Sequence, residues 1–363
     1  MNVPLLTDTA RTLLANGKGL LAMDESNPTC NQRFAKLGIP QTVEARRAYR
    51  GMIVTTPGLG ESISGAILYD ETIRQSTKAG TPFLKILADA GIMPGIKVDA
   101  GAKDLAAHPG EKITEGLDGL RERLAEYFQM GARFAKWRAV ITIGEGLPSR
   151  SGLEANAHAL ARYAALCQEA GILPIVEPEV LMEGNHSLER CRQVTEEVLR
   201  TVFIQLNCQR VLLEGMLLKP NMVLAGLGSP LPQEVREVAA GEQQFQVQLM
   251  NRQPEEEADV NEVADVTVKS LWRTVPAAVP GIAFLSGGQS PELASARLNM
   301  MNRRFHSQLP WALTFSFARA IQQPALEIWQ GSDANVPAAQ KALLHRANCN
   351  RAARRGEYTS AMA

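Results

Sequence analysis

The sequence carries no excess charge of either sign, because Lys and Arg together number 38 and Asp and Glu together also number 38 among its 363 residues. Bulk composition therefore gives no reason to expect a nucleic acid or an anionic membrane as a partner, and any affinity for an anion must come from a local cluster of basic side chains. No uninterrupted apolar run approaches the ~20 residues that a membrane-spanning helix needs. The first residues also lack the basic segment and long apolar stretch of a secretory signal.

Cysteine and histidine are both scarce and scattered. The five cysteines form no C-x-x-C pair, and their odd number favours reduced thiols in a cytoplasmic protein over a disulfide framework. The five histidines include no two at zinc-ligand spacing. We therefore expect a cytoplasmic protein with no cofactor and no histidine-based metal site, although distant segments could still combine their ligands.

Eight short apolar runs recur along the chain, and such runs are typical of strands that are buried on both faces. They occupy residues 19–24, 63–70, 93–99, 134–140, 173–179, 211–220, 281–287 and 311–317. The segments between them show helical patterns, with apolar residues three and four apart or with a Ser before the first turn. The clearest of these lie at 115–130, 153–170, 187–206 and 290–304.

Eight strand-then-helix units in one chain predict a single-domain α/β fold, the closed (β/α)8 barrel or TIM barrel. The alternative is an open doubly wound sheet, which would bind a ligand at one crevice and would not need charged residues at every strand end. We expect the barrel to span residues 1–345, with a surface excursion at about 226–258. Residues 346–363 are expected to form a C-terminal tail, whose end, EYTSAMA, looks mobile.

Charged and polar residues follow the predicted strands at their carboxyl ends, where barrels of this type carry their chemistry. The ends in order carry Asp24, Asp70, Lys97 with Asp99, Lys136 with Arg138, Glu177 with Glu179, Lys219, Ser286 and Ser316. Residues two apart in a strand share a face, so the members of each pair point the same way. A single charge at a strand end is more often a salt bridge or a cap, but a whole rim of charges indicates a polar site.

Lys219 differs from the other cations of this rim in its setting. It follows Leu217 and Leu218 and precedes Pro220, at a point where a strand is stopped. Partly apolar surroundings, and a neighbouring cation such as Lys136, both favour the neutral form of an amine. A neutral amine can attack a ketone and form an iminium ion, which is the electron sink needed to break a carbon–carbon bond without metal.

A separate signal for phosphate binding lies in FLSGGQS, residues 284–290. Ser286, Gly287 and Gly288 come just before an expected helix start, where backbone N–H groups and the helix N-terminus both attract an anion. Barrels often build a phosphate site after strands seven and eight. This segment follows the seventh run, and residues 316–319 follow the eighth.

With these residues aligned, the chain resembles the class I, Schiff-base-forming fructose-bisphosphate aldolases over nearly its full length. Eight motifs carry the resemblance in the same order, namely GKGLLAMDES (17–26), GIKVD (95–99), GLDGLRER (116–123), FAKWR (134–138), VEPE (176–179), LLKPNM (217–222), FLSGGQS (284–290) and PWALTFS (310–316). The resemblance implies a metal-independent enzyme of glycolysis and gluconeogenesis that reversibly cleaves fructose 1,6-bisphosphate to dihydroxyacetone phosphate and glyceraldehyde 3-phosphate. It also implies a homo-oligomer, with a tetramer favoured because the family is commonly tetrameric.

The resemblance assigns a role to each matching residue. It makes Lys219 the Schiff-base lysine, Glu177 the acid and base that dehydrates the carbinolamine, and Asp24 the carboxylate that accepts the C4-hydroxyl proton. Lys136 is the lysine that tunes the charge beside the iminium. The remaining residues are Glu179 and Lys97 in the supporting polar network, Arg138 as a further substrate-side cation, Ser286, Gly287, Gly288, Ser316 and Arg319 at the C1-phosphate, and Arg33, Ser26 and Thr29 at the C6-phosphate.

Three departures from the family pattern bear on these roles. The family often has Ser-Tyr-Gly-Arg after strand eight, where this chain has Ser-Phe-Ala-Arg at 316–319. The sequence ends soon after Tyr358, so either Tyr358 or another group replaces the terminal tyrosine that assists proton exchange in animal members. The segment 226–258 is longer than the usual connection, and its role is open.

Two other functions stay open at this point. The chain could be a Schiff-base lyase of the same barrel type that acts on another ketose phosphate, but the two expected phosphate sites, at Arg33 and at Ser286 with Arg319, favour a bisphosphate. It could instead be a non-enzymatic scaffold on the same fold. A scaffold could lose Lys219 or Glu177 without penalty, yet both residues are present.

Overall fold

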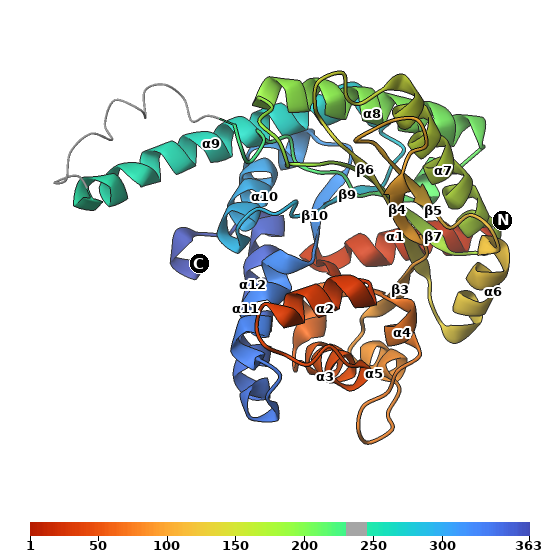
Figure 1. Cartoon of the computed structure of the whole chain (residues 1–363), viewed down its shortest axis with the longest axis vertical. Coiled ribbons are helices and arrows are strands. Elements are labelled where there is room, and N and C mark those ends of the chain that lie inside the picture. Colours follow the sequence, from red (N-terminus) through yellow and green to blue (C-terminus); the bar gives the residue numbers. More distant parts are fainter. Residues whose placement is uncertain (230–244) are drawn as a thin grey trace.

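A computed structural model describes residues 1–229 and 245–363, and over residues 245–258 it describes the backbone alone. Eight parallel strands close into one barrel (Figure 1). In order around it they are β1 (Gly19–Met23), β2 (Ile63–Leu68), β3 (Met93–Lys97), β6 (Phe134–Ile141), β7 (Leu173–Val180), β8 (Leu217–Leu218), β9 (Gly281–Phe284) and β10 (Ala312–Phe317). Because β10 pairs with β1, the closed barrel confirms the predicted single-domain (β/α)8 fold and excludes the open doubly wound sheet.

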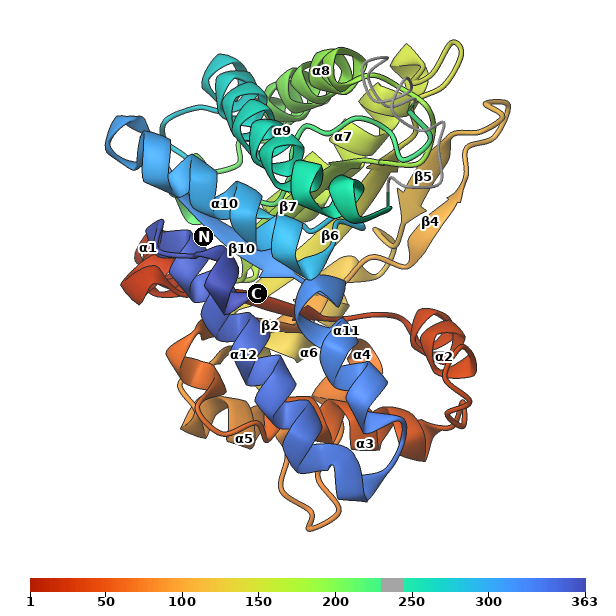
Figure 2. The same cartoon turned by 90° about the vertical axis from the view of Figure 1, so that its left-hand side faces the viewer.

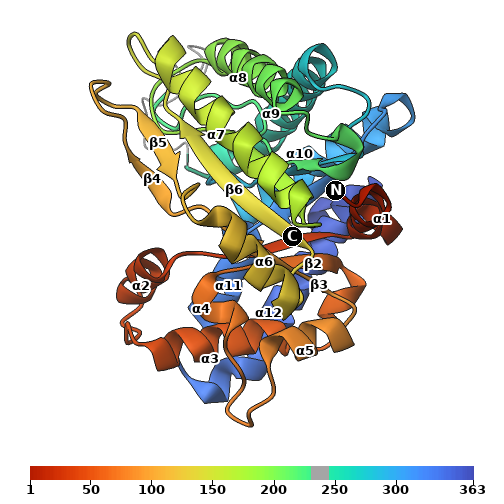
Figure 3. The same ribbon diagram turned by 90° about the vertical axis from the view of Figure 1, so that its right-hand side faces the viewer.

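Helices alternate with the strands and surround them, as Figures 1, 2 and 3 show from three sides. They are α1 (Val3–Leu14), α2 (Asn27–Ala35), α3 (Val43–Val54), α4 (Asp70–Ile73), α5 (Phe83–Asp89), α6 (Leu120–Met130), α7 (Arg150–Glu169), α8 (Leu188–Cys208), α9 (Phe245–Thr274), α10 (Pro291–Phe305), α11 (Arg319–Trp329) and α12 (Val336–Arg355). The hydroxyls of Ser149, Ser187 and Ser290 accept backbone N–H groups in the first turns of α7, α8 and α10. With these caps, three of the four helices that the sequence predicted begin close to the positions at which they were expected to begin.

The face of the strands that points into the barrel changes from apolar to charged along its length. Near the amino ends of the strands, a buried cluster closed by α1 contains Leu20, Phe134, Leu173 and Leu217. At an even number of residues further along the same strands, and hence on the same face, are Asp24, Lys136, Glu177 and Lys219. The sequence therefore fills the barrel with hydrocarbon at one end and presents ionisable groups at the other.

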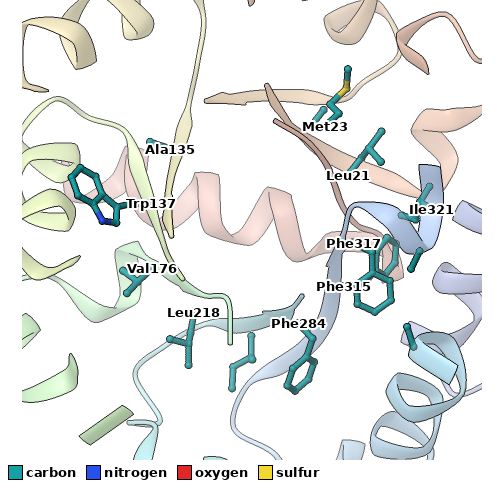
Figure 4. Packing of buried hydrophobic residues seen from close by; sticks show 14 of the residues in the cluster. Leu21, Met23, Ala135, Trp137, Val176, Leu218, Phe284, Phe315, Phe317 and Ile321 are labelled. Carbon is teal, nitrogen blue, oxygen red and sulfur yellow. The ribbon is translucent and has the colours of Figure 1, made fainter. Parts of the chain in front are cut away.

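The opposite face of the strands packs against the helices. Figure 4 shows part of this larger cluster, including Trp137 from β6 and Val176 from β7. The Trp137 ring lies 5.6 Å from the ring of Tyr163 on α7, measured between centroids. The Tyr163 hydroxyl donates to the carbonyl of Ala135 at 2.7 Å and accepts the N–H of Ile175 at 3.1 Å. Because Trp137 is held on the helix side, its neighbour Lys136 must point into the barrel.

The sixth predicted strand is much shorter than expected. Of the run 211–220, only β8 (Leu217–Leu218) is extended, because Leu213–Gly215 form a turn of 3-10 helix. The N–H of Lys219 still donates to the carbonyl of Val176 at 2.8 Å. This bond continues the parallel pairing by one residue and fixes the backbone of Lys219 beside β7.

The helix that was expected at 115–130 begins later, and a β-hairpin that the sequence analysis did not predict precedes it. Strands β4 (Gly101–Asp104) and β5 (Lys112–Glu115) pair antiparallel, and the helix begins only at Leu120. Gly116 and Gly119 separate hairpin and helix, and both have positive φ, at 123° and 64°. Figures 2 and 3 show the hairpin standing out from the barrel beside β6.

The expected boundary between barrel and tail, at residues 345 and 346, requires correction because it lies inside α12. This helix continues to Arg355, and its buried residues Ala347, Asn350 and Ala353 belong to the face that packs on the barrel. Beyond it, the N–H of Tyr358 donates to Asn299 Oδ1 on α10 at 2.9 Å, and the Cys349 thiol donates to the carbonyl of Met362 at 3.0 Å. The end of the chain is therefore packed rather than free.

The expected surface excursion at 226–258 falls partly on residues 230–244, which lie outside the described residues. Before them, the N–H groups of Gly226, Leu227 and Gly228 donate to carbonyls in the loop that follows β7, each at 2.8 Å. After them, the chain from Phe245 onward is α9. The described residues at the start of this segment are thus bonded to the loop that follows β7.

Candidate active site

Four ionisable side chains from four different strand ends meet inside the barrel. The Lys219 Nζ lies 3.0 Å from Glu177 Oε1, and the Lys136 Nζ lies 3.2 Å from Glu177 Oε2. The same Lys136 Nζ lies 2.8 Å from Asp24 Oδ2. All four side chains are at least nine-tenths buried. The order Lys219, Glu177, Lys136, Asp24 is thus a continuous chain of alternating charge, with a lysine at one end and a carboxylate at the other.

The charges in this cluster stabilise one another against burial. Burial alone would raise the pKa of Asp24, but the ammonium groups of Lys136 and Lys219 outweigh it and lower the pKa to about 2. Burial likewise opposes ionisation of Glu177, and the same two lysines hold its pKa below the ordinary value. Burial disfavours the Lys136 ammonium, yet Asp24 and Glu177 raise its pKa. Asp24 and Glu177 are therefore anions, and Lys136 is a cation, near neutral pH.

A second group of charges borders the first on the side of β3 and β6. The Lys97 Nζ lies 2.5 Å from Asp99 Oδ1, and the backbone N–H of Arg138 donates to Asp99 Oδ2 at 3.2 Å. The Arg138 guanidinium is half-exposed and forms an ion pair with the buried carboxylate of Glu179. Lys97 also helps to lower the pKa of Asp24. The sequence placed Asp99 at the rim without giving it a role, and the structure makes it the carboxylate that holds Lys97.

The glycines and serines after β9 and β10 form a cradle with the start of α11. Gly287 and Gly288 have φ values of 56° and 84°, which an L side chain rarely adopts. A Cβ on Gly288 would lie 3.7 Å from the exposed Arg319 guanidinium, so that cation stands over the glycine loop. The hydroxyl of buried Ser316 has no hydrogen-bond partner among the described residues and is available to a ligand. Ser286 is also buried beside this loop.

The cradle is attached to the backbone that carries Lys219. The N–H of Leu285 donates to the carbonyl of Pro220 at 3.1 Å, directly after the lysine. Ser290 caps α10 by accepting the N–H of Leu293 at 3.1 Å, which orients the first turn of that helix. An anion in the cradle would consequently be held close to the strand end that positions Lys219.

The other expected phosphate residues, Ser26, Thr29 and Arg33, lie on α2 and at its N-cap, just after Asp24. Ser26 is the N-cap of this helix, and its hydroxyl lies 3.0 Å from the Thr29 hydroxyl. Arg33 follows one turn later and forms an ion pair with Glu25. Its other guanidinium nitrogen donates to Gln323 Oε1 on α11 at 3.1 Å. Arg33 therefore reaches the same helix that Arg319 begins.

Sequence reasoning missed a carboxylate and a cation in this region. The sequence predicts no role for Glu25 or for Arg50, yet Arg50 Nη1 lies 2.8 Å from Glu25 Oε2. Alternation along β1 could have indicated that Glu25 points away from Asp24. Nothing in the sequence pairs it with a residue 25 positions further on.

Two residues that the sequence analysis considered for the site, Asp70 and Tyr358, do not contact the Lys219 cluster. Asp70 begins α4, pairs with Arg74 and accepts a hydrogen bond from the Tyr127 hydroxyl at 2.9 Å. Tyr358 is buried between α10 and α12, beside Arg346, and burial raises its pKa. In this position Tyr358 contributes no contact to the Lys219 cluster.

Within residues 1–229 and 245–363, no group of three or more His, Cys, Asp or Glu side chains could hold a metal ion. Across the same residues, none of the helices is both long and apolar enough to cross a membrane.

A closed barrel with a buried lysine beside a carboxylate at its rim, and with a glycine cradle attached to the backbone that follows this lysine, has the parts of a Schiff-base lyase. The family model of class-I fructose-bisphosphate aldolases matches residues 5–253 and 243–363. The chain belongs to this family.

Curated relatives and a solved structure agree with that membership. A probable fructose-bisphosphate aldolase class 1 of Xanthomonas campestris pv. campestris is 52% identical over 359 residues, which is 99% of both chains. The cytosolic fructose-bisphosphate aldolase 5 of Arabidopsis thaliana is 48% identical over 98% of this chain and 91% of its own. The solved fructose-bisphosphate aldolase of Plasmodium falciparum has a TM-score of 0.88 at 44% identity, over 98% of this chain and 96% of that one.

Proposed function

We propose that this chain is a class I aldehyde-lyase that cleaves fructose 1,6-bisphosphate reversibly to dihydroxyacetone phosphate and glyceraldehyde 3-phosphate through a Schiff base on Lys219. The activity serves glycolysis and gluconeogenesis. The observation that carries the proposal is the chain of contacts from Lys219 through Glu177 and Lys136 to Asp24. Each of the four groups has a distinct task in the breaking of one carbon–carbon bond.

The first task is to make a nucleophile, and the Lys219–Glu177 pair supplies it. Transfer of one proton over the 3.0 Å between Lys219 Nζ and Glu177 Oε1 leaves a neutral amine beside a carboxylic acid. The amine adds to the C2 carbonyl of the ketose. Glu177 then returns its proton to the departing C2 hydroxyl, so that water leaves and an iminium ion remains. The Glu177 carboxylate that results lies beside the new positive charge and stabilises it.

The second task is cleavage, which Asp24 performs. Its carboxylate accepts the proton of the C4 hydroxyl, the C3–C4 bond breaks, and the electron pair passes into the iminium to give an enamine and the aldehyde product. Lys136 keeps its charge throughout because two carboxylates flank it. It thereby holds Asp24 and Glu177 in place without joining the proton transfers. Protonation of the enamine at C3 and hydrolysis then release dihydroxyacetone phosphate.

The third task is to hold the two phosphates. We assign the C1-phosphate to Ser286, Gly287, Gly288, Ser316 and Arg319, and the C6-phosphate to Ser26, Thr29 and Arg33. Lys97 and Arg138 add positive charge on the substrate side, and Glu179 orients Arg138. Two separate anion sites favour a bisphosphate over the alternative, a Schiff-base lyase acting on another ketose phosphate.

Borohydride reduction tests the mechanism. Added with substrate, borohydride should reduce the iminium and leave a stable adduct, which peptide mapping by mass spectrometry should place on Lys219. The peptide that contains Lys136 should stay unmodified, although that lysine is buried to the same degree. An unmodified Lys219 after full turnover would remove the Schiff base from the mechanism.

For the assembly and location we propose a cytoplasmic homo-oligomer, with a tetramer as the favoured state. Support for the location comes from the Arabidopsis relatives, which are named cytosolic. Sedimentation velocity on the full chain tests the assembly, where a monomer at micromolar concentration would contradict it.

A further inference from the structure

Glu25, two residues after the end of β1, lies between two arginines. Its two oxygens accept hydrogen bonds from the guanidinium groups of Arg33 and Arg50, and its backbone carbonyl accepts a further one from Arg50 at 3.1 Å. The Arg50 side chain is 3% exposed, whereas those of Glu25 and Arg33 are 11% and 12% exposed. Arg50 is therefore the inner member of the triad, and Arg33 is the arginine nearer to solvent.

The charges of the triad explain why it needs two arginines. Burial would raise the pKa of Glu25, but Arg50 and then Arg33 outweigh it and keep the pKa below its ordinary value, so Glu25 is an anion. Arg33 paired with Glu25 alone would form a neutral unit, which attracts a phosphate dianion weakly. With Arg50 included, the three residues carry one net positive charge.

The surroundings fix this arrangement from two further sides. The Tyr49 ring lies 5.6 Å from the Arg50 guanidinium and 5.9 Å from that of Arg33, so both cations face the same aromatic ring. The Tyr49 hydroxyl donates to Gln322 Oε1 on α11 at 2.8 Å, next to the Gln323 that accepts from Arg33. Arg33 is thus held in place by Glu25, Gln323 and the Tyr49 ring.

We infer that Arg50 is a positioning and specificity-determining residue for the phosphate at the far end of the substrate. By offsetting the charge of Glu25, Arg50 leaves Arg33 with the net positive charge that recognises a C6-phosphate. Arg50 itself touches no reacting atom. This inference rests on the proposed function, because it takes Arg33 as the C6-phosphate residue.

Two substrates of one enzyme measure the effect. Fructose 1,6-bisphosphate carries the C6-phosphate and fructose 1-phosphate lacks it, so the ratio of their kcat/KM values isolates recognition at that end. In Arg50→Gln the ratio should fall about tenfold, roughly the value of one charged hydrogen bond. The fall should come from a higher KM for the bisphosphate, with kcat/KM for fructose 1-phosphate nearly unchanged.

Arg46→Gln is the matched control. Arg46 lies one turn earlier on the same helix α3, its side chain is 8% exposed, and it forms an ion pair with Glu71 at 2.7 Å instead of with Glu25. Its loss should lower stability by a similar amount and leave the ratio unchanged. An equal change of the ratio in both variants would make the effect one of general loosening and would overturn the inference.

The double variant Glu25→Gln with Arg50→Gln distinguishes the effect of the Arg50 charge from the effect of its contacts. It removes one negative and one positive charge, so Arg33 regains the net positive charge, and the ratio should return to within about threefold of the unmodified chain. A ratio as low as in Arg50→Gln alone would refute the charge argument. If Arg50→Gln does not fold, Arg50→Lys is used instead. Because lysine keeps the positive charge, the ratio of kcat/KM values should then stay near that of the unmodified chain, and a tenfold fall of the ratio would refute the charge argument. Absence of any cleavage by the unmodified chain would refute the proposed function instead.

Discussion

Replacement of Glu177 by Gln removes one negative charge and the only titratable group that contacts both buried lysines among the described residues. The amide keeps the shape of the side chain but cannot take a proton from Lys219 or return it to the C2 hydroxyl. Positioned proton transfer contributes about 10²–10⁴-fold to a rate, so kcat should fall by that range. Borohydride trapping in a single turnover should slow in parallel, because dehydration of the carbinolamine precedes the trapped iminium.

The same change should also destabilise the fold. Breaking a buried ion pair by removing one partner costs about 3–5 kcal/mol, and Glu177 pairs with two lysines that are both at least nine-tenths buried. We expect a loss at the lower end, about 3 kcal/mol, because Asp24 still pairs with Lys136 at 2.8 Å. Denaturant unfolding followed by circular dichroism measures this difference.

Glu179→Gln provides the comparison, since Glu179 lies two residues further on the same strand and is also buried, with 9% of its side chain exposed against 4% for Glu177. Its partner Arg138 is 43% exposed and can turn to water, so the expected loss is about 1 kcal/mol of stability and less than about tenfold in kcat. If Glu179→Gln lowered kcat as much as Glu177→Gln, the proton-transfer role would belong to the network as a whole and the assignment to Glu177 would be refuted.

Three further outcomes are expected. The proposed lysine chemistry needs no metal, so EDTA should leave turnover unchanged, and activity that vanishes and returns with a divalent ion would contradict it. The pKa of Asp24 is about 2 against an ordinary 3.8, so its ionised form adds about 2 kcal/mol of stability above pH ~4, which is lost as the pH falls toward 2. The difference in unfolding free energy between the unmodified chain and Asp24→Asn should therefore become smaller over that pH range. A difference that stays constant would be evidence against the lowered pKa. Tyr358→Phe should keep kcat within about twofold, because Tyr358 packs between α10 and α12; a larger loss would make it the proton donor after cleavage.

Much of the fold follows from patterns that the sequence displays directly. Each of the eight apolar runs overlaps one of the eight barrel strands. This follows because a closed barrel needs apolar side chains both in its interior and between its strands and the surrounding helices. The β4–β5 hairpin was missed because its strands, GAKD and KITE, are four residues long, half-exposed and partly charged. The continuation of α12 past residue 345 was missed because its buried residues there, Arg346, Ala347, Cys349, Asn350, Ala353 and Arg354, are small or polar and form no apolar pattern.

The candidate site was predictable to the extent that it depends on alternation along single strands. Spacing by two residues placed Lys136 and Glu177 inside the barrel, since neither depends on another strand for its direction. Pairings across the barrel could not be read in this way. Asp24 reaches Lys136 although β1 and β6 are not neighbours in the sheet. The Glu25–Arg50 contact similarly depends on how α3 docks beside β1, which no local pattern encodes.

Lys136 and Lys219 illustrate what such pairings decide. Both are buried, at 4% and 3% exposure, and both stand at the carboxyl end of a strand, so burial and position assign them the same role. Their carboxylate partners differ. The Lys136 ammonium lies between Asp24 and Glu177, which raise its pKa, whereas Lys219 pairs with Glu177 and with no second carboxylate among the described residues. In the proposed mechanism, the division of roles between an electrostatic lysine and a nucleophilic one therefore depends on Asp24, which follows the first strand of the barrel and pairs with Lys136.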